Sequence, residues 1–298
     1  MANLKEIRKR IDSVNTTKQI TNAMKLVAAS KLRKAQTSVV RLRPYASKLR
    51  RIMQNVSTAY ESKESQAIDN NAFTVQREAH KILLVPVSSN KGLCGPFNSS
   101  VTKETIRHIE EEYSTQYNNG NLDIITIGKK VNEFLKSKGY SVKAEYNSLF
   151  DDLSYENVSK FALNLIDDFS NKKYDKIILI YNQFKNASTQ VLVSEQFLPV
   201  LLPESKEAAT EIDYIFEPER EILIEKLILQ TLQIQFFKVL LNSNASEQGA
   251  RMVAMHKATE NATELVKDLQ LFYNKARQAA ITREIIEIVS GAEALKGK

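Results

Sequence analysis

Both ends of this 298-residue chain carry apolar side chains at the alternating three- and four-residue spacings of a coiled coil. A helix with such a seam needs a second helix to cover it. The C-terminal seam comprises Met255, Ala258, Ala262, Leu265, Leu269, Phe272, Ala276 and Ala279. The N-terminal seam comprises Leu4, Ile7, Ile11, Val14, Ala28, Leu32, Ala35, Val39, Leu42, Ala46, Leu49, Met53, Val56 and Tyr60. We therefore predict that two terminal helices coil together, with the rest of the chain inserted between them.

The N-terminal seam is interrupted by polar residues and later by a proline. Lys18, Thr21 and Lys25 occupy three successive seam positions. Polar residues in a coiled-coil seam fix its register, or they mark where side chains turn to another partner. Pro44 removes one backbone hydrogen bond of the helix, so we expect a bend near Arg43 and not the start of a second domain.

Composition restricts the classes of function that are open to the chain. Cys94 is the only cysteine, which excludes an internal disulfide and a cysteine-based zinc cluster. The three histidines are scattered without ligand spacing, so we expect no metal site. No apolar run approaches the length that spans a bilayer, and we expect a chain outside the membrane that keeps its own N-terminus.

Positive charge is concentrated in the first helix. Residues 1–60 contain 14 lysines and arginines against Glu6 and Asp12, a net charge of +12, whereas the whole chain carries +7. Such a run is either a solvated helix face or a surface for an acidic protein or for nucleic acid.

The middle of the chain changes to alternating strands and helices, which predicts an α/β layer with a mostly parallel sheet. A polar segment, 61–79, reads as a linker to it. We expect strands at 82–87, 123–127, 140–146, 176–181 and 190–200, the last at an edge, and helices at 98–117, 128–138 and 155–170. The predicted parts are thus an N-terminal helix (1–60), the linker (61–79), a Rossmann-like domain (80–217) and a C-terminal helix (218–298).

The loop from Ser88 to Pro96 is the one candidate for phosphate binding, because it follows a strand and precedes a helix. It lacks the glycine spacing of dinucleotide sites, and the chain contains no Walker A motif. We expect its glycines to shape a turn and Cys94 to be a buried structural thiol. The sequence contains no catalytic constellation.

The C-terminal helix is predicted to be longer than its partner. Pro218 to Gly291 measures roughly 110 Å as a helix, and Leu4 to Tyr60 roughly 85 Å. The last turns should therefore overshoot by roughly 25 Å. That tip is apolar on more than one face, at Ile281, Ile285, Ile286, Ile288 and Val289, so we expect a surface outside this chain to enclose it.

Three segments together closely resemble the gamma subunit of the F-type ATP synthase. They are the opening LKEIRKRIDSVNTTKQITNAMKLVAASKLRKAQ, the central KGLCGPFN and the closing stretch from ASEQGARMVAMHK to REIIEIVSGAEAL. The resemblance implies an antiparallel coiled-coil shaft inside a ring of alpha and beta subunits. It also implies an α/β foot that rests with the epsilon subunit on the membrane c-ring, peripheral to the cytoplasmic face of a bacterial membrane. In that family proton flow turns the rotor, and ATP, ADP and Mg²⁺ bind the alpha and beta subunits, so this chain would be non-catalytic and hold no cofactor.

The resemblance also assigns residues. Met24 and Lys25 match the family's rotor–lever contact, and Arg277, Gln278 and Thr282 match its catch contacts to a beta loop. Glu247 and Arg251 match a second contact cluster. The foot-domain loop comprises Gly92, Leu93, Cys94 and Gly95, followed by Pro96 where the family commonly has a glycine, and the tip in the sleeve comprises Ile281, Ile285, Ile288 and Val289.

Two other functions remain open from the residues alone. A basic coiled coil could bind nucleic acid, although here the basic residues share their helix with the seam and form no separate arm. A phosphate-binding α/β enzyme would instead bind nucleotide tightly as an isolated chain.

Overall fold

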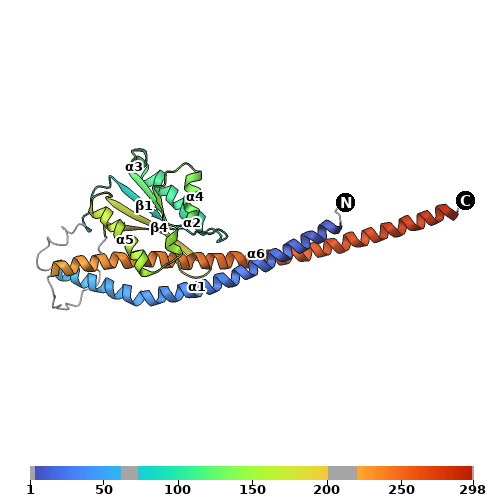
Figure 1. Cartoon of the computed structure of the whole chain (residues 1–298), viewed down its shortest axis with the longest axis horizontal. Coiled ribbons are helices and arrows are strands. Elements are labelled where there is room, and N and C mark those ends of the chain that lie inside the picture. The colour runs from blue at the N-terminus through green and yellow to red at the C-terminus, as the bar shows by residue number, and fades with distance from the viewer. Residues whose placement is uncertain (1–3, 62–72, 201–219, 297–298) are drawn as a thin grey trace. The chain divides into compact units, whose positions relative to one another are not determined.

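The computed structural model describes residues 4–61, 73–200 and 220–296 (Figure 1). Two compact units divide the chain: a coil unit formed by residues 1–28 and 252–298, and a sheet unit formed by residues 29–251. The long helices α1 (Leu4–Glu61) and α6 (Arg220–Lys296) each contribute to both units. The four-part division stays a prediction, because much of the linker 61–79 and the boundary at 217 lie outside the described residues.

A five-stranded sheet in the order β3-β2-β1-β4-β5 forms the centre of the sheet unit. Its strands are β1 (Ile82–Pro86), β2 (Leu122–Thr126), β3 (Ala144–Glu145), β4 (Lys176–Phe184) and β5 (Gln190–Leu198). The pairs β3–β2, β2–β1 and β1–β4 are parallel, whereas the edge strand β5 is antiparallel to β4. This confirms the predicted mostly parallel sheet and the edge position of its last strand.

Helices cover both faces of the sheet because its central strands are apolar on both sides. On one face Ile82 and Leu84 pack with α2 (Phe97–Arg107) and α4 (Lys129–Ser137). On the other, Leu83 and Val85 pack with α5 (Tyr155–Ser170) and with α6. A 3₁₀ turn, η2 (Ser148–Phe150), precedes α5.

Two of the predicted elements are wrong in extent. The helix expected at 98–117 is divided into α2, a π-helical turn η1 (His108–Glu112) and α3 (Ser114–Asn118). The π turn accompanies a buried His108, whose ring nitrogens lie 2.7 Å from the Glu112 carboxylate and 2.6 Å from the Ser194 hydroxyl. The strand expected at 140–146 shrinks to β3, because the side chains at its beginning, Tyr140 and Val142, pack onto the apolar cluster under α4.

Within the sheet unit, α6 lies between the sheet and α1 (Figure 1). The predicted α1 seam is buried here at Leu32, Ala35, Val39 and Leu49, and α1 continues through Pro44 as one helix. From Lys238 to Arg251 every α6 residue is buried except Lys238 and Asn244, which are half-buried. A Cβ on Gly249 would lie 3.2 Å from the carbonyl oxygen of Ala187, so glycine permits this close approach to the β4–β5 loop.

Within the coil unit, α1 and α6 run antiparallel with Ile7, Thr21 and Ala28 buried on α1. The hydroxyl oxygens of Thr21 and Thr259 lie 2.9 Å apart across the pair. Thr21 was one of the three polar interruptions of the seam, and it is the place where the two helices are joined by a side-chain hydrogen bond.

The predicted C-terminal seam is wrong at three of its positions. Leu265 is 40% exposed, Phe272 is 51% exposed and Ala279 is also exposed, whereas Val266 is buried. Met255 and Ala262 are buried as predicted. The alternate positions move by one residue, because Thr259 and not Ala258 contacts Thr21, and Val266 takes the buried place expected for Leu265. An α-helix has 3.6 residues per turn and drifts in this way against a strict seven-residue repeat.

Candidate functional site

The C-terminal end of α6 presents an uncovered apolar surface within the coil unit. All side chains from Ile281 to Glu293 are exposed. The apolar members, which we call the tip cluster, are Ile281 (48% exposed), Ile285 (55%), Ile286 (58%), Ile288 (70%) and Val289 (51%). An apolar patch of this kind on a helix that the described chain leaves bare is typical of a docking surface.

The register of the coil explains why the tip cluster is bare. In an antiparallel pair, the about 17 residues from Thr21 back to Leu4 lead along α6 from Thr259 to about Ala276. The remaining turns, to Lys296, therefore have no α1 residue opposite them and extend the helix by roughly 30 Å. This agrees with the overshoot expected from the helix lengths.

Three predicted polar contact residues lie on α6 just beyond Ala276, where α1 no longer lies opposite it. Arg277, Gln278 and Thr282 are all exposed on α6. The Thr282 hydroxyl donates a 2.9 Å hydrogen bond to the Gln278 carbonyl oxygen, so its bonding capacity is partly used within the helix. Their assignment as contacts to another subunit stays a prediction.

A second surface of the coil unit lies on α1 around Met24 and Lys25, which are half-buried. Beside them Ile20, Leu26 and Val27 are 55%, 62% and 56% exposed. These three were not among the predicted contacts. Their signal was present in the sequence, because they are large apolar residues at positions that the α1 seam does not use.

In the sheet unit, the loop between β1 and α2 is built around a buried Cys94. Its thiol accepts a 3.2 Å hydrogen bond from the Asn98 amide, and burial raises its pKa. The neighbours Leu93 and Gly95 have positive φ angles of 63° and 57°, and the Leu93 side chain points to solvent, 65% exposed. Pro96 precedes the first helical residue with a φ of −78°, which is a normal proline angle at a helix start.

The loop is tied to α6 by the buried Arg251, which also forms an ion pair with Glu247 of the same helix. Arg251 donates to the Glu247 carboxylate at 2.5 Å and, through its other terminal nitrogen, to the carbonyl oxygens of Lys91 (3.0 Å) and Gly92 (3.2 Å). Arg251 and Glu247 are only 9% and 8% exposed. Burial raises the pKa of Glu247, and the guanidinium of Arg251 opposes that rise.

The predicted residues therefore fall into two groups. The structure brings Gly92, Cys94, Glu247 and Arg251 together inside the sheet unit, where Arg251 holds the loop by hydrogen bonds to its carbonyl oxygens. Met24, Lys25, Arg277, Gln278, Thr282 and the tip cluster lie on the surface of the coil unit. The remaining loop residues, Leu93 and Gly95, are exposed on the sheet unit. Contact of Glu247 and Arg251 with a ring of subunits stays a prediction.

The described residues contain no group of three or more metal-ligating side chains and no helix that is long and apolar enough to cross a membrane.

A family model described as ATP synthase matches residues 3–295 of the chain. An ATP synthase gamma chain from Flavobacterium johnsoniae is 52% identical over 297 residues and covers 100% of both chains. One from Cytophaga hutchinsonii is 48% identical over 298 residues, with 99% of each chain covered.

Solved structures with the same fold come from mitochondrial ATP synthases. The central stalk and c-ring structure from Tetrahymena thermophila contains a chain that is 27% identical with a TM-score of 0.58, over 80% of this chain and 99% of that one. A chain in the Euglena gracilis enzyme has a TM-score of 0.65 at 20% identity and covers 98% of this chain and 94% of that one, which supports the fold alone.

Proposed function

This chain belongs to the ATP synthase gamma chain family, and on that premise we propose that it is the central-stalk rotor subunit of an F-type ATP synthase. In this role it couples rotation of a membrane c-ring to conformational change at catalytic sites on beta subunits, during synthesis or hydrolysis of ATP. The observation that carries the proposal is the bare tip cluster of α6, an apolar helix end that needs an enclosing partner.

The tip cluster fits an apolar sleeve formed by a ring of alpha and beta subunits. Met24, Lys25, Arg277, Gln278 and Thr282 are the polar and mixed contacts that we assign to beta subunits, together with the exposed Ile20, Leu26 and Val27. The excess of basic residues in α1 complements an acidic segment of a beta subunit. For Glu247 and Arg251, burial favours the internal role of holding the loop.

Coupling requires that the rotor surface contacts different beta conformations unequally. A rotor face that stabilises one conformation over another shifts that site's affinity for nucleotide, by the difference in contact free energy. The exposed apolar residues of this chain provide contact area with the beta subunits. The basic residues of α1 orient the chain against an acidic segment without requiring a deeply buried interface.

The finer assignments follow the same premise. The chain itself is non-catalytic, and ATP, ADP and Mg²⁺ bind the alpha and beta subunits. The sheet unit rests with an epsilon subunit on the c-ring, so the chain is peripheral to the cytoplasmic face of the bacterial membrane, and proton flow drives it. The relatives and solved structures compared above belong to ATP synthases and give the nucleic-acid alternative no support.

Reconstitution with alpha and beta subunits tests the proposal. A chain ending at Thr282 should assemble with the ring much more weakly than the full chain, while the sheet unit still unfolds at the same denaturant concentration. Native mass measurement of the complex reports assembly, and circular dichroism reports the fold. Full-strength assembly by the shortened chain would rule out the tip cluster as the seated element.

A further inference from the structure

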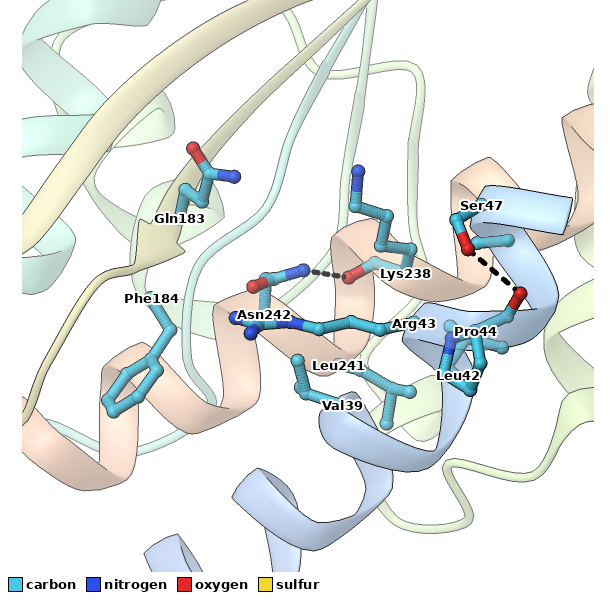
Figure 2. Close-up of a pocket in the computed structure, with 11 residues that line it drawn as sticks. Val39, Leu42, Arg43, Pro44, Ser47, Gln183, Phe184, Lys238, Leu241 and Asn242 are labelled. Carbon is cyan, nitrogen blue, oxygen red and sulfur yellow. Dashed lines mark hydrogen bonds between the residues drawn. The ribbon is translucent and has the colours of Figure 1, made fainter. Parts of the chain in front are cut away.

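A cavity of about 660 Å³ lies inside the sheet unit, between α1, α6 and the end of β4. Its floor contains Val39, Leu241 and Asn242, which are buried, and its rim contains Arg43 and Lys238 (Figure 2). This volume is within the range of sites that enclose a small organic molecule. The cavity is separate from the tip cluster and from the loop held by Arg251.

A proline of α1 lies at this level. Pro44 lines the cavity, and its ring takes the place of its own backbone N–H. A proline inside a helix also crowds the carbonyl group four residues earlier and so disturbs the regular backbone of α1 beside the cavity. The opening coincides with the one seam segment that contains a proline.

The charges at the cavity are all of one sign. Arg43 and Lys238 line it, and no carboxylate does. Among the described residues neither cation is paired with an acidic side chain. Figure 2 shows the Arg43 side chain reaching from α1 across the opening toward Asn242 of α6, whose amide nitrogen donates a 2.8 Å hydrogen bond to the Lys238 carbonyl oxygen.

The apolar lining and the two cations together determine which kind of molecule the cavity can bind. Apolar side chains of Val39, Leu241 and Phe184 line the cavity together with the amide of Gln183. An apolar body would bury surface against the first three. A carboxylate, sulfonate or phosphate would accept charge-assisted hydrogen bonds from the guanidinium and the ammonium. We infer that this cavity binds a single small organic anion with an apolar body, and that the anion bridges α1 to α6.

The probe for the test is 8-anilinonaphthalene-1-sulfonate, which has an aromatic body and one sulfonate and fluoresces when it is enclosed. Titration of the full-length chain should show one site that weakens about tenfold or more in Arg43→Gln/Lys238→Gln, because a hydrogen bond to a charged group contributes that much. The matched control is Arg41→Gln/Lys226→Gln, which removes the same charges from exposed positions of the same two helices outside the cavity lining. The control should bind as the original chain does.

A neutral probe separates charge from apolar contact. N-phenyl-1-naphthylamine has the same rings without the sulfonate, and it should bind the original chain about as weakly as the sulfonate binds Arg43→Gln/Lys238→Gln. Equal binding of both probes, or an unchanged sulfonate affinity in that variant, would overturn the proposal, because the probe would then be held at an apolar surface such as the tip cluster.

A filled cavity gives an independent check. Ala46→Trp places a large ring in the cavity lining and should abolish the site while far-ultraviolet circular dichroism stays unchanged. If this variant does not fold, the charge variants still decide the outcome. The same titration in the assembled complex distinguishes a small organic anion from a segment of another subunit as the occupant of the cavity. Retained binding of the sulfonate probe supports the small-molecule site. Loss of probe binding on assembly would overturn it, because a segment of another subunit would then fill the cavity.

Discussion

At the scale of single residues, Gly128 shows most directly why a particular amino acid is required. It lies just before α4 with a φ of 99°, and an added Cβ would lie 2.4 Å from the carbonyl oxygen of Ser88. Gly128→Ala should therefore lose about 2–4 kcal/mol of unfolding free energy, from backbone strain and overpacking together. Denaturant unfolding of the full chain measures this loss.

Gly139 is the matched control for that substitution. Its φ is 86°, but no atom lies within 4 Å of the position of an added Cβ. Gly139→Ala should cost only the strain, about 1–2 kcal/mol. Equal losses at the two glycines would mean that the contact with Ser88 relaxes freely.

The ion pair of Arg251 and Glu247 gives a prediction that depends on pH. Arg251→Met leaves the buried carboxylate without its cation and should cost about 3–5 kcal/mol at neutral pH. Burial already raises the pKa of Glu247, and loss of the guanidinium removes the effect that lowers it. A carboxyl with a raised folded-state pKa favours the folded state at acid pH, and this contribution is lost as the pH rises through that pKa.

The stability of Arg251→Met should therefore fall as the pH rises from about 4 to about 8, relative to the original chain. The double variant Glu247→Gln/Arg251→Met loses the same bonds to Lys91 and Gly92 but has no carboxylate to titrate. Its deficit should be nearly independent of pH. A pH slope that persists in the double variant would assign the effect to another group.

At the scale of elements, two substitutions in α6 of the coil unit distinguish the observed seam from the predicted one. Val266 is buried and Leu265 is 40% exposed, although the heptad frame assigned Leu265 to the interface. Val266→Ala should cost about 1–2 kcal/mol, and Leu265→Ala less than about 0.5 kcal/mol. Hydrogen exchange of the α6 amides between Met255 and Gln270 reports the stability of this unit by itself. The reverse order of the two effects would restore the predicted frame.

Most elements could be predicted because their signals are local. Periodicity located α1, α6 and the central strands, and the number of residues in each helix was enough to predict the overshoot. The exact seam could not be predicted, since it depends on Thr259 meeting Thr21 across the pair. The buried His108 of the π turn likewise lies within hydrogen-bond distance of Ser194, a residue 86 positions away on β5, and such a contact cannot be read from local sequence.

The candidate site was predictable to the extent that it consists of exposed side chains on long helices. The tip cluster follows from helix length and apolar faces alone. The tie between Arg251 and the Lys91–Gly92 carbonyls could not be found this way, because a backbone acceptor leaves no mark in the sequence. The resemblance assigns Arg251 to a contact with another subunit, which stays a prediction, and in this structure Arg251 is buried against the loop.

At the scale of the whole molecule, the tip cluster should act in assembly and not in folding. Ile285→Ser/Ile288→Ser should weaken binding to a ring of alpha and beta subunits by a hundredfold or more, because each buried isoleucine contributes about 1.5–3 kcal/mol. Since both side chains are exposed here, the unfolding of the isolated chain should not change. Surface plasmon resonance with the assembled ring measures the affinity.

The control replaces two exposed valines that have no assigned partner, Val40→Ser/Val191→Ser. It should leave ring affinity unchanged. A comparable loss in the control would show that general surface polarity, and not the tip cluster, determines seating.

The burial of α6 between Lys238 and Arg251 has a mechanical consequence. A helix enclosed on nearly every side cannot turn about its own axis unless the surrounding side chains are displaced, and close-packed interiors resist such displacement. The surrounding side chains of the sheet unit therefore resist rotation of this length of α6 about its own axis, whereas α1 is packed on one side only.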